Sequence, residues 1–269
     1  MTVLVGVRCR DGIVIGSDSA VTYSPIADPN FFTAEAPNAR KVYVVHNEIV
    51  VATTGEVGLG QRLVQLLNEA LRDQNQRNNF LNAPPENAGI WISENVTANF
   101  KRTLATWARS YDMGALIGVV VQNEPRLYWF DGMNFRPELV GERDAAGHFC
   151  TLPVITHGGG QRLADPFILH AHRVLFGEDH FPDVAQGRLL VAWTLDHVIR
   201  YNVGGVGGAS YIVALERNNG TWHAGEVNQD EIKQSVKDIE NHIRNYGKPE
   251  TEETAPDLDQ LNVQPTHDN

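Results

Sequence analysis

The chain has 269 residues, of which 42% are hydrophobic and 20% charged, a composition typical of a globular protein that is long for a single domain. Its formal net charge of -11 at pH 7 argues against nucleic acid or an anionic membrane surface as a partner, because both attract basic patches. No apolar run approaches the roughly twenty residues that cross a bilayer, and no secretory signal is recognisable, so we expect a cytoplasmic protein without membrane contact.

The first predicted element is a β-hairpin near the N-terminus. Val3 to Cys9 is an apolar run rich in β-branched residues, Asp11-Gly12 is a strong signal for a two-residue turn, and Ile13 to Ile15 resumes the apolar run. Such a hairpin folds Asp18 back toward Thr2. It therefore brings a hydroxyl and a carboxylate together within one short segment.

Thr2 is the candidate nucleophile of this hairpin. A secondary hydroxyl reacts poorly by itself, and removal of Met1 would supply a base in the α-amine of Thr2. This amine titrates at about pH 8, so an appreciable fraction is neutral at cytoplasmic pH. We therefore expect Met1 to be absent from the mature chain.

A long loop and a second hairpin follow. The loop, Tyr23 to Asn38, contains three prolines and either shapes a substrate cleft or is a surface insertion. Its adjacent aromatic residues Phe31-Phe32 favour contact with a ligand or partner. The hairpin pairs Lys41 to Val45 with Ile49 to Thr54.

Gly55 separates this hairpin from a helix expected over about Glu56 to Arg72. Gly55 has no Cβ and stands at a helix N-terminus, where backbone donors are unpaired. Its N–H could therefore approach a reacting carbonyl and stabilise an oxyanion. Without further support from the sequence, a simple turn is the alternative.

The next helical region is predicted as a helix, a loop and a second helix. Five leucines from Leu59 to Leu71, together with Ala70, form a one-sided apolar stripe that suits packing on a sheet. The polar stretch Asp73 to Asn87 reads as a surface loop or an insertion that contacts a partner. Ser93 is expected to cap a helix that extends to Tyr111.

Strands and glycine turns dominate the middle of the chain. Ala115 to Gln122 and Arg126 to Phe130 predict a buried hairpin, and Thr151 to Thr156 predicts another strand. This strand leads into Gly158-Gly159-Gly160, which is read as a tight turn before a helix, since no phosphate-binding motif surrounds it. That helix is expected over Gln161 to Phe176, with Val174 and Leu175 among its inward residues.

Neither the cysteines nor the histidines predict a metal site, and no cofactor motif is present. Cys9 and Cys150 are too few for a disulfide framework and too far apart for a metal motif, so both are expected to be reduced core residues. His170 and His172 are two residues apart on the expected helix and therefore point away from each other.

The C-terminal part is expected to complete the domain. A helix over Asp183 to Tyr201, a glycine-rich segment, a hairpin from Ser210 to Glu226 and an amphipathic helix over Asp230 to Tyr246 follow one another. The glycine-rich segment either lets the backbone approach the active site closely or is a lid or plain loop. We expect residues 1–247 to form one domain and residues 248–269, with six acidic residues, to form a disordered acidic tail.

Several of these segments resemble one protein family. Residues 16–22, Gly-Ser-Asp-Ser-Ala-Val-Thr, resemble the Gly-Ala-Asp-Ser-Arg-Ala-Thr segment of proteasome β-type subunits and of the peptidase ring in the bacterial two-component ATP-dependent protease. The separation of Lys41 and Gly55 matches that family without a gap, and the likeness spans roughly residues 2–245. The resemblance implies an α+β fold, the four-layer αββα sandwich of N-terminal nucleophile hydrolases.

The resemblance also implies a threonine-dependent endopeptidase that acts on peptides or unfolded proteins as a subunit of a homo-oligomeric ring. Thr2 would be the nucleophile, Lys41 paired with Asp18 would keep a positive charge near its amine, and Gly55 would donate to the oxyanion. Ser17 and Thr22 would frame the substrate backbone, while Thr53 and Val57 would line a medium-sized apolar specificity pocket. An ATPase unfoldase is a candidate partner, and no cofactor or metal is implied.

The sequence departs from the family in two supporting segments. The family's Gly-Ser-Gly turn reads His157-Gly158-Gly159-Gly160 here, so its serine is missing. A second supporting aspartate and serine have no clear counterparts, and Asn202 is the nearest polar substitute. Two alternatives to the peptidase therefore stay open, a small-molecule amidase on the same fold and a catalytically silent ring or binding subunit. Retention of Met1 would indicate the silent subunit.

Overall fold

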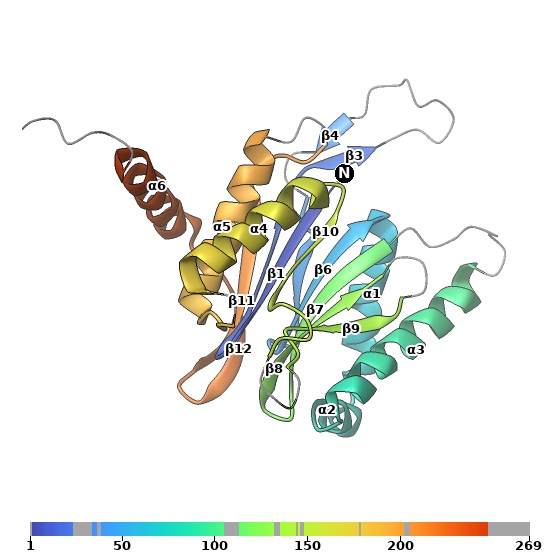
Figure 1. Ribbon diagram of the computed structural model, residues 1–269. Coiled ribbons are helices and arrows are strands. Elements are labelled where there is room, and N and C mark those ends of the chain that lie inside the picture. Colours follow the sequence, from blue (N-terminus) through green and yellow to red (C-terminus); the bar gives the residue numbers. More distant parts are fainter. Residues whose placement is uncertain are drawn as a thin grey trace, which may run out of the picture.

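The computed structural model describes residues 2–23, 34–36, 39–104, 113–131, 135–143, 145, 148–177, 179–201 and 205–246. Within this part of the chain, two antiparallel five-stranded sheets lie face to face (Figure 1). The first sheet has the strand order β10-β1-β2-β11-β12, with β1 Val3–Cys9, β2 Gly12–Asp18, β10 Val154–Gly158, β11 Ser210–Asn218 and β12 Thr221–Glu226. The second has the order β5-β6-β7-β8-β9, with β5 Val42–Val45, β6 Ile49–Gly55, β7 Met113–Val121, β8 Glu124–Phe130 and β9 Pro137–Val140.

Helices cover the outer face of each sheet, which confirms the predicted four-layer sandwich. On the first sheet lie α4 Gln161–Phe176 and α5 Val184–Tyr201, and α6 Gln229–Tyr246 packs against α5 (Figure 1). On the second lie α1 Val57–Ala70, α2 Gln74–Leu81 and α3 Pro85–Leu104. A short ribbon of β3 Val21–Tyr23 and β4 Ala34–Ala36 stands apart from both sheets.

Three apolar clusters separate the four layers. Alternate residues of β1 illustrate why, since Val3, Val5 and Val7 face the helices α4 and α5, while Leu4 faces the second sheet. Strands that are buried on both faces read as continuous apolar runs, as β1 and β7 do. The sequence pattern therefore predicts these strands but not which sheet face each residue occupies.

The predicted hairpins are confirmed with small shifts of their boundaries. Val45 pairs with Ile49, so the hairpin of β5 and β6 turns through the three residues 46–48, with φ values of 50° at His46 and 60° at Asn47. Gln122 and Asn123, with φ values of 53° and 63°, form a tight two-residue turn between β7 and β8, so β8 begins two residues earlier than expected. The strand predicted at residues 151–156 lies instead at Val154–Gly158, paired with β1.

The prediction of a surface loop over Asp73 to Asn87 is wrong, because this segment forms α2 and the start of α3. The Asp73 carboxylate accepts hydrogen bonds from the backbone N–H groups of Asn75 and Gln76 and caps α2. Phe80, only 3% exposed, packs its ring 4.9 Å from that of Trp91 on α3. One buried aromatic residue and one cap thus outweigh the polar composition of the segment.

The expected helix cap at Ser93 is also wrong. Ser93 lies within α3, and its Oγ donates a hydrogen bond to the Phe135 carbonyl at 2.5 Å. On α4, Val174 is 66% exposed and Leu175 is also exposed, whereas Ile168 and His172 face inward. Cys150 is exposed rather than buried, while Cys9 is a core residue as expected.

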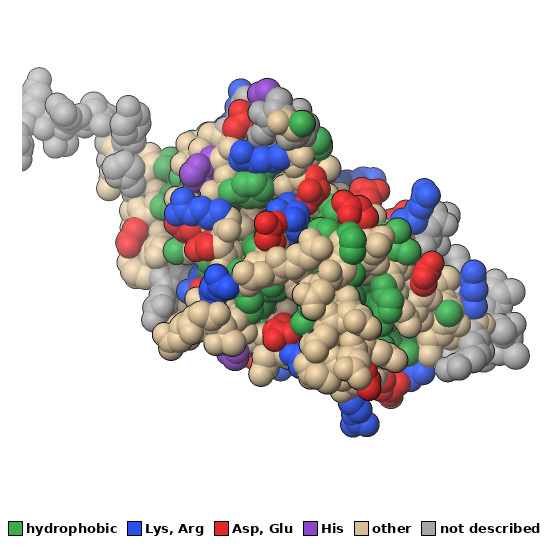
Figure 2. Space-filling model, turned by 90° about the horizontal axis from the view of Figure 1, so that it is seen from below, with side chains coloured by type: hydrophobic (Ala, Val, Ile, Leu, Met, Phe, Trp, Pro, Cys, Tyr) green, Lys and Arg blue, Asp and Glu red, His purple; other side chains and the backbone are tan. Residues whose placement is uncertain are grey.

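Several predictions concern residues outside the described part of the chain: Met1, the loop with Phe31-Phe32, the helix end at Tyr111, Asn202 and the acidic tail from residue 248. Among the described helices, none combines the length and apolar character needed to span a membrane. The face of the molecule that points down in Figure 1 carries acidic and basic side chains spread among apolar ones (Figure 2).

Candidate active site

Asp18 is the polar centre of the site next to Thr2. It is the last residue of β2, and its side chain is fully buried. Its Oδ1 accepts hydrogen bonds from Lys41 Nζ at 2.8 Å and from the backbone N–H of Val3 at 2.9 Å. Its Oδ2 accepts from the N–H groups of Ala20 at 3.3 Å and Gly207 at 3.2 Å. Four donors therefore compensate one buried carboxylate.

Lys41 is nearly buried as well, with an exposed fraction of 6%. It directly precedes β5, so the second sheet supplies the cation and the first sheet supplies the anion. Burial lowers the pKa of Lys41, because desolvation disfavours the ammonium, while the charge of Asp18 acts in the opposite direction. A compact cation with a lowered pKa is thus held across the gap between the sheets. The Asp18 oxygen that binds it also accepts the N–H of Val3, the residue that follows Thr2.

Thr2 is partly exposed, and glycines fix its backbone. Its carbonyl accepts a hydrogen bond from the N–H of Gly160 at 3.2 Å. Gly158 has φ +99°, and a Cβ at this position would come within 2.4 Å of the Thr2 carbonyl oxygen. The glycine turn is therefore required for the close approach of two backbone segments. It also begins α4 as predicted, with Gly160 at the N-cap.

Gly55 lies at the exposed end of β6, with φ 95°, immediately before Glu56 and helix α1. Its neighbour Thr54 belongs to the same corner of the molecule as Thr2. Thr54 Oγ1 would lie 3.1 Å from a Cβ on Gly158, the same point that approaches the Thr2 carbonyl. The structure thus brings the ends of β1, β6 and β10 together.

The four predicted substrate-binding residues occupy different environments. Ser17 is fully buried, and its Oγ has no hydrogen-bond partner in the described part of the chain, so it does not line an open surface. Thr53 is 8% exposed and lies against α1, where a Cβ on Gly60 would meet its Oγ1 at 2.4 Å. Val57, the first residue of α1, is 41% exposed. Thr22 belongs to β3, and its side chain is outside the description.

Sequence reasoning missed three participants of this site. Thr54 and His157 both face the gap between the sheets near Thr2, where a Cβ on Gly114 would lie 2.0 Å from His157 Nε2. Period-two alternation from Val50 and Ala52, which face the gap, would have pointed to Thr54 rather than Thr53. Ser19 accepts a hydrogen bond from the N–H of Ala209 at 2.8 Å. This bond and that from Gly207 to Asp18 show that the glycine-rich segment approaches the site closely.

The described part of the chain holds no group of three or more His, Cys, Asp or Glu side chains suited to a metal ion. His170 is exposed on α4. His172 is buried, and its Nε2 lies 3.0 Å from the His180 carbonyl oxygen.

Comparisons with known proteins support the resemblance to proteasome subunits. A family model of the proteasome subunit matches residues 2–135, which include Thr2, Asp18, Lys41 and Gly55. The proteasome subunit beta of Methanosarcina barkeri is 30% identical over 132 residues, or 49% of this chain and 56% of that protein. The chain is a divergent homologue of proteasome subunits. The corresponding subunit of Methanobrevibacter smithii is 24% identical over 130 residues, 48% of this chain and 55% of that subunit.

The matches thus span just over half the length of these curated relatives. A solved structure, the Anbu (Gly-1) mutant from Hyphomicrobium sp. strain MC1, is similar to this protein. The similarity covers 91% of this protein's chain and 96% of the Anbu chain. Its TM-score is 0.62 and its sequence identity 16%, so it supports the fold. The fold of the N-terminal nucleophile hydrolase type is thereby confirmed.

Proposed function

We propose that this proteasome homologue is a threonine-dependent endopeptidase and acts as a subunit of a homo-oligomeric ring. The observation that carries the proposal is the Asp18 carboxylate, which binds Lys41 Nζ at 2.8 Å and the backbone N–H that follows Thr2 at 2.9 Å. This contact ties the candidate nucleophile to a buried cation. The family match, which includes all of these residues, supports the same assignment.

The proposed reaction begins with Thr2 as the first residue of the mature chain. Its Oγ forms a bond to the peptide carbonyl carbon, and the Oγ proton passes to the neutral α-amine. The positive charge of Lys41 lowers the pKa of this amine and so increases the neutral fraction. The N–H of Gly55 donates to the oxyanion of the tetrahedral intermediate.

The intermediate collapses when the C–N bond of the substrate breaks and the amine proton moves to the leaving amine. The product is an ester between Thr2 Oγ and the acyl part of the substrate. Water, deprotonated by the same α-amine, then attacks the ester carbonyl carbon. The bond from this carbon to Thr2 Oγ breaks, the amine returns the proton to Oγ, and the acid is released. The chain's own groups supply every proton transfer in this sequence, so no cofactor is required.

Substrate contacts are assigned to the residues around the end of β6. Val57 is accessible to a substrate side chain, and Thr53, which lies against Gly60 of α1, is assigned to the same specificity pocket. Thr22 would bind the substrate backbone. Ser17 is proposed to support this surface from beneath and not to bind substrate, because its side chain is fully buried. Peptides and unfolded proteins in the cytoplasm are the proposed substrates, and an ATPase unfoldase is the proposed partner for folded ones.

The decisive test joins the mass of the N-terminal peptide with peptide hydrolysis. We expect a chain that starts at Thr2, cleaves peptide bonds and is acylated at Thr2 by an electrophilic threonine probe, with Thr2→Ala inactive but assembled. Hydrolysis of small amides without peptide cleavage would indicate the amidase. A Met1-blocked chain that no probe acylates would indicate the silent subunit.

The ring is tested by size-exclusion chromatography. We expect hydrolysis to follow an oligomeric fraction, since the exposed apolar residues of the outer helices, such as Val174, would be covered in an assembly. Thr2→Ala is the matched control for assembly without activity. Full hydrolysis by a monomeric fraction would contradict the ring and leave the threonine mechanism intact.

A further inference from the structure

His157 has no role in the proposed reaction, yet its imidazole lies between the two sheets. It belongs to β10, and a Cβ on Gly114 of β7 would come within 2.0 Å of its Nε2, so the ring fills the space that a side chain at position 114 would need. The ring also meets Trp129 of β8 edge-on, with the ring centroids 5.7 Å apart. A residue of the first sheet is thus wedged into the second.

The wedge is next to Thr2. The residue that follows His157 is Gly158, which pairs with Val3 and whose Cβ would lie 2.4 Å from the Thr2 carbonyl oxygen. Gly114, on which the imidazole rests, is the cross-strand partner of Thr54. The position of the imidazole therefore constrains the backbone turn that contacts Thr2.

The choice of a histidine here is not explained by packing. His157 Nδ1 and Trp129 Nε1 are both buried and have no hydrogen-bond partner in the described part of the chain. An unpaired buried polar atom costs free energy, and a purely apolar ring would fill the same space without that cost. A polar, titratable ring at this point suggests a function that depends on its protonation.

We propose that His157 is a positioning residue for Thr2: its neutral imidazole, wedged against Gly114 and Trp129, holds the Gly158 turn on the Thr2 carbonyl, and protonation of the ring releases that turn. The proposal rests on the proposed threonine mechanism and extends it to the segment where the chain departs most clearly from the resembling family.

Burial of the ring favours its neutral form near pH 7, and the nearby charges act against this. Burial lowers the pKa of His157, and the carboxylates of Asp131, after β8, and Asp165, on α4, oppose this effect. Asp165 already accepts hydrogen bonds from Thr156 Oγ1 and from Gln161 Nε2. The cross-strand partner Leu4 and Gly114 contribute no charge. The pKa of His157 therefore lies below its usual value of 6.5. At a pH low enough to protonate the ring, the imidazolium would stand in an apolar gap that stabilises it poorly.

The first experiment changes the ring and its slot separately. His157→Ala removes the wedge and is expected to lower kcat on the order of tenfold to a hundredfold with little change in KM, because Thr2 is displaced by a fraction of an ångström to an ångström. Gly114→Ala should give a similar loss, since its Cβ would displace the imidazole. The double variant His157→Ala/Gly114→Ala removes the clash and should be no worse than either single variant.

The second experiment uses the pH profile. The acid limb of wild-type kcat should contain two ionisations, the α-amine of Thr2 and His157, whereas His157→Phe should retain activity near pH 7 and show only one. His157→Gln, which is smaller and equally unable to titrate, serves if the phenylalanine variant does not fold. His170→Phe, a change at an exposed histidine of α4, is the matched control and should keep both ionisations.

A readout without catalysis separates this inference from the proposed function. The methyl NMR signal of labelled Thr2 should shift with the titration of the His157 ring in the wild type and lose that step in His157→Phe. This result would support the positioning role even in a chain that cleaves no peptide. If peptides are cleaved but His157→Phe keeps both ionisations and the Thr2 step, His157 has no positioning role and the threonine mechanism stands.

Discussion

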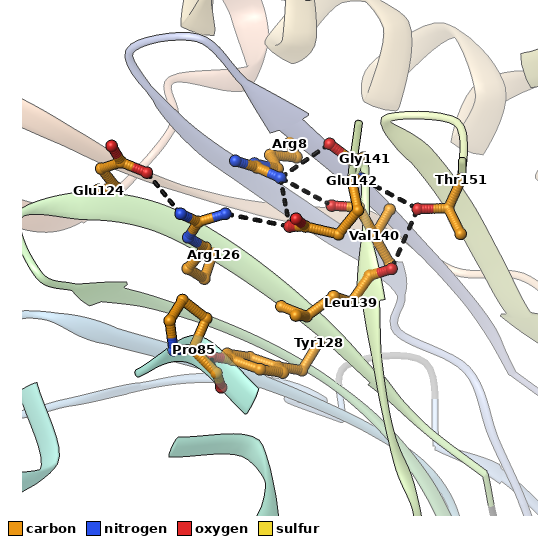
Figure 3. A network of polar contacts seen from close by, with 10 residues as sticks. All are labelled: Arg8, Pro85, Glu124, Arg126, Tyr128, Leu139, Val140, Gly141, Glu142 and Thr151. Atoms are coloured by element: carbon orange, nitrogen blue, oxygen red, sulfur yellow. Dashed lines mark hydrogen bonds and ion pairs between the residues drawn. The ribbon is translucent and has the colours of Figure 1, made fainter. Parts of the chain in front are cut away.

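Two ion-pair networks lie at opposite ends of β1, and their differences show what a buried cation can be used for. At the Thr2 end, Lys41 and Asp18 form one pair that is almost removed from water. At the other end, Arg8 and Arg126 share the Glu142 carboxylate in a network that solvent reaches (Figure 3). Both join the two sheets, but only the first lies beside a candidate nucleophile.

The Arg8 network uses the many donors of a guanidinium. Arg8 Nη1 donates to Glu142 Oε1 at 2.7 Å and to the Gly141 carbonyl at 2.8 Å, so it also fixes the chain after β9. Arg126 Nη1 binds the same Glu142 oxygen at 3.0 Å and Nη2 binds Glu124 at 2.5 Å (Figure 3). The Arg8 guanidinium also lies 5.2 Å from the centre of the Phe181 ring. These planar, multidentate contacts suit a structural tie.

The Lys41 pair is built differently. Burial lowers the pKa of both Lys41 and Arg8, but a guanidinium starts from a much higher value, so it stays charged at pH values where a compact ammonium titrates. The carboxylate of Asp18 is held by backbone N–H groups, so its position depends on the fold and not on Lys41 alone. Such a pair places a positive charge at a defined point, which is what the proposed mechanism requires of it.

The largest expected effect comes from breaking the Lys41 pair. Lys41→Met and Asp18→Asn should each lower peptide hydrolysis on the order of a hundredfold or more, because the charge near the Thr2 amine is lost. Each leaves a buried partner uncompensated, so the free energy of unfolding in urea should fall by about 3–5 kcal/mol. The double variant should recover most of the stability and none of the activity. A near-normal rate in either single variant would refute the charge assignment, and Lys41→Arg should also be inactive.

The matched change at the other end should affect stability alone. Arg8→Met is expected to lower the free energy of unfolding by about 2–3 kcal/mol, since charged hydrogen bonds to Glu142 and Gly141 are lost. Turnover per folded molecule should be unchanged. Arg10→Met is the control, because Arg10 is 58% exposed in its pair with Asp183 and such pairs contribute less than about 1 kcal/mol. A loss of turnover in Arg8→Met without a loss of stability would show that the two ends are coupled.

The two networks should also differ in their response to alkaline pH. Because burial lowers the pKa of Lys41 from 10.5, the unfolded chain binds more protons than the folded chain between the lowered value and 10.5. The unfolding free energy of the wild type relative to Lys41→Met should therefore rise with pH in this window. Hydrolysis should fall in the same window, because the ammonium is lost. Stability and rate that rise or fall together in this window would contradict the assignment. The unfolding free energy of the wild type relative to Arg8→Met should show no such change with pH in the same window.

The smallest expected effect is on thiol labelling. Burial raises the pKa of the Cys9 thiol well above its usual value, while Cys150 is exposed. The native protein should react rapidly at one thiol and the unfolded chain at two. Arg8→Met should accelerate labelling of Cys9, its neighbour on β1, whereas Arg10→Met should not. Equal rates of Cys9 labelling in the wild type, Arg8→Met and Arg10→Met would show that the Arg8 network does not control the exposure of Cys9.

The sequence by itself determined the elements and the spacing of the site. Apolar runs and two-residue turns follow from local patterns, because alternation and turn chemistry act within a few residues. The N-terminal hairpin pattern pointed to Thr2 and Asp18, whereas the roles of Lys41 and Gly55 rest on the resemblance to the family. The prediction of a loop at the polar segment of α2 is wrong, since this helix depends on the cap at Asp73 and on the burial of Phe80 against α3. Composition does not reveal such a distant partner.

Only the tertiary structure decided which side chain of each pair faces the site. Neighbouring strand residues point to opposite faces, so a choice between Thr53 and Thr54 requires knowing which face meets the other sheet. For the same reason the burial of Ser17 and the wedge of His157 against Gly114 were not evident from the sequence. Local patterns specify that a strand forms, whereas the packing of two sheets specifies what each of its side chains touches.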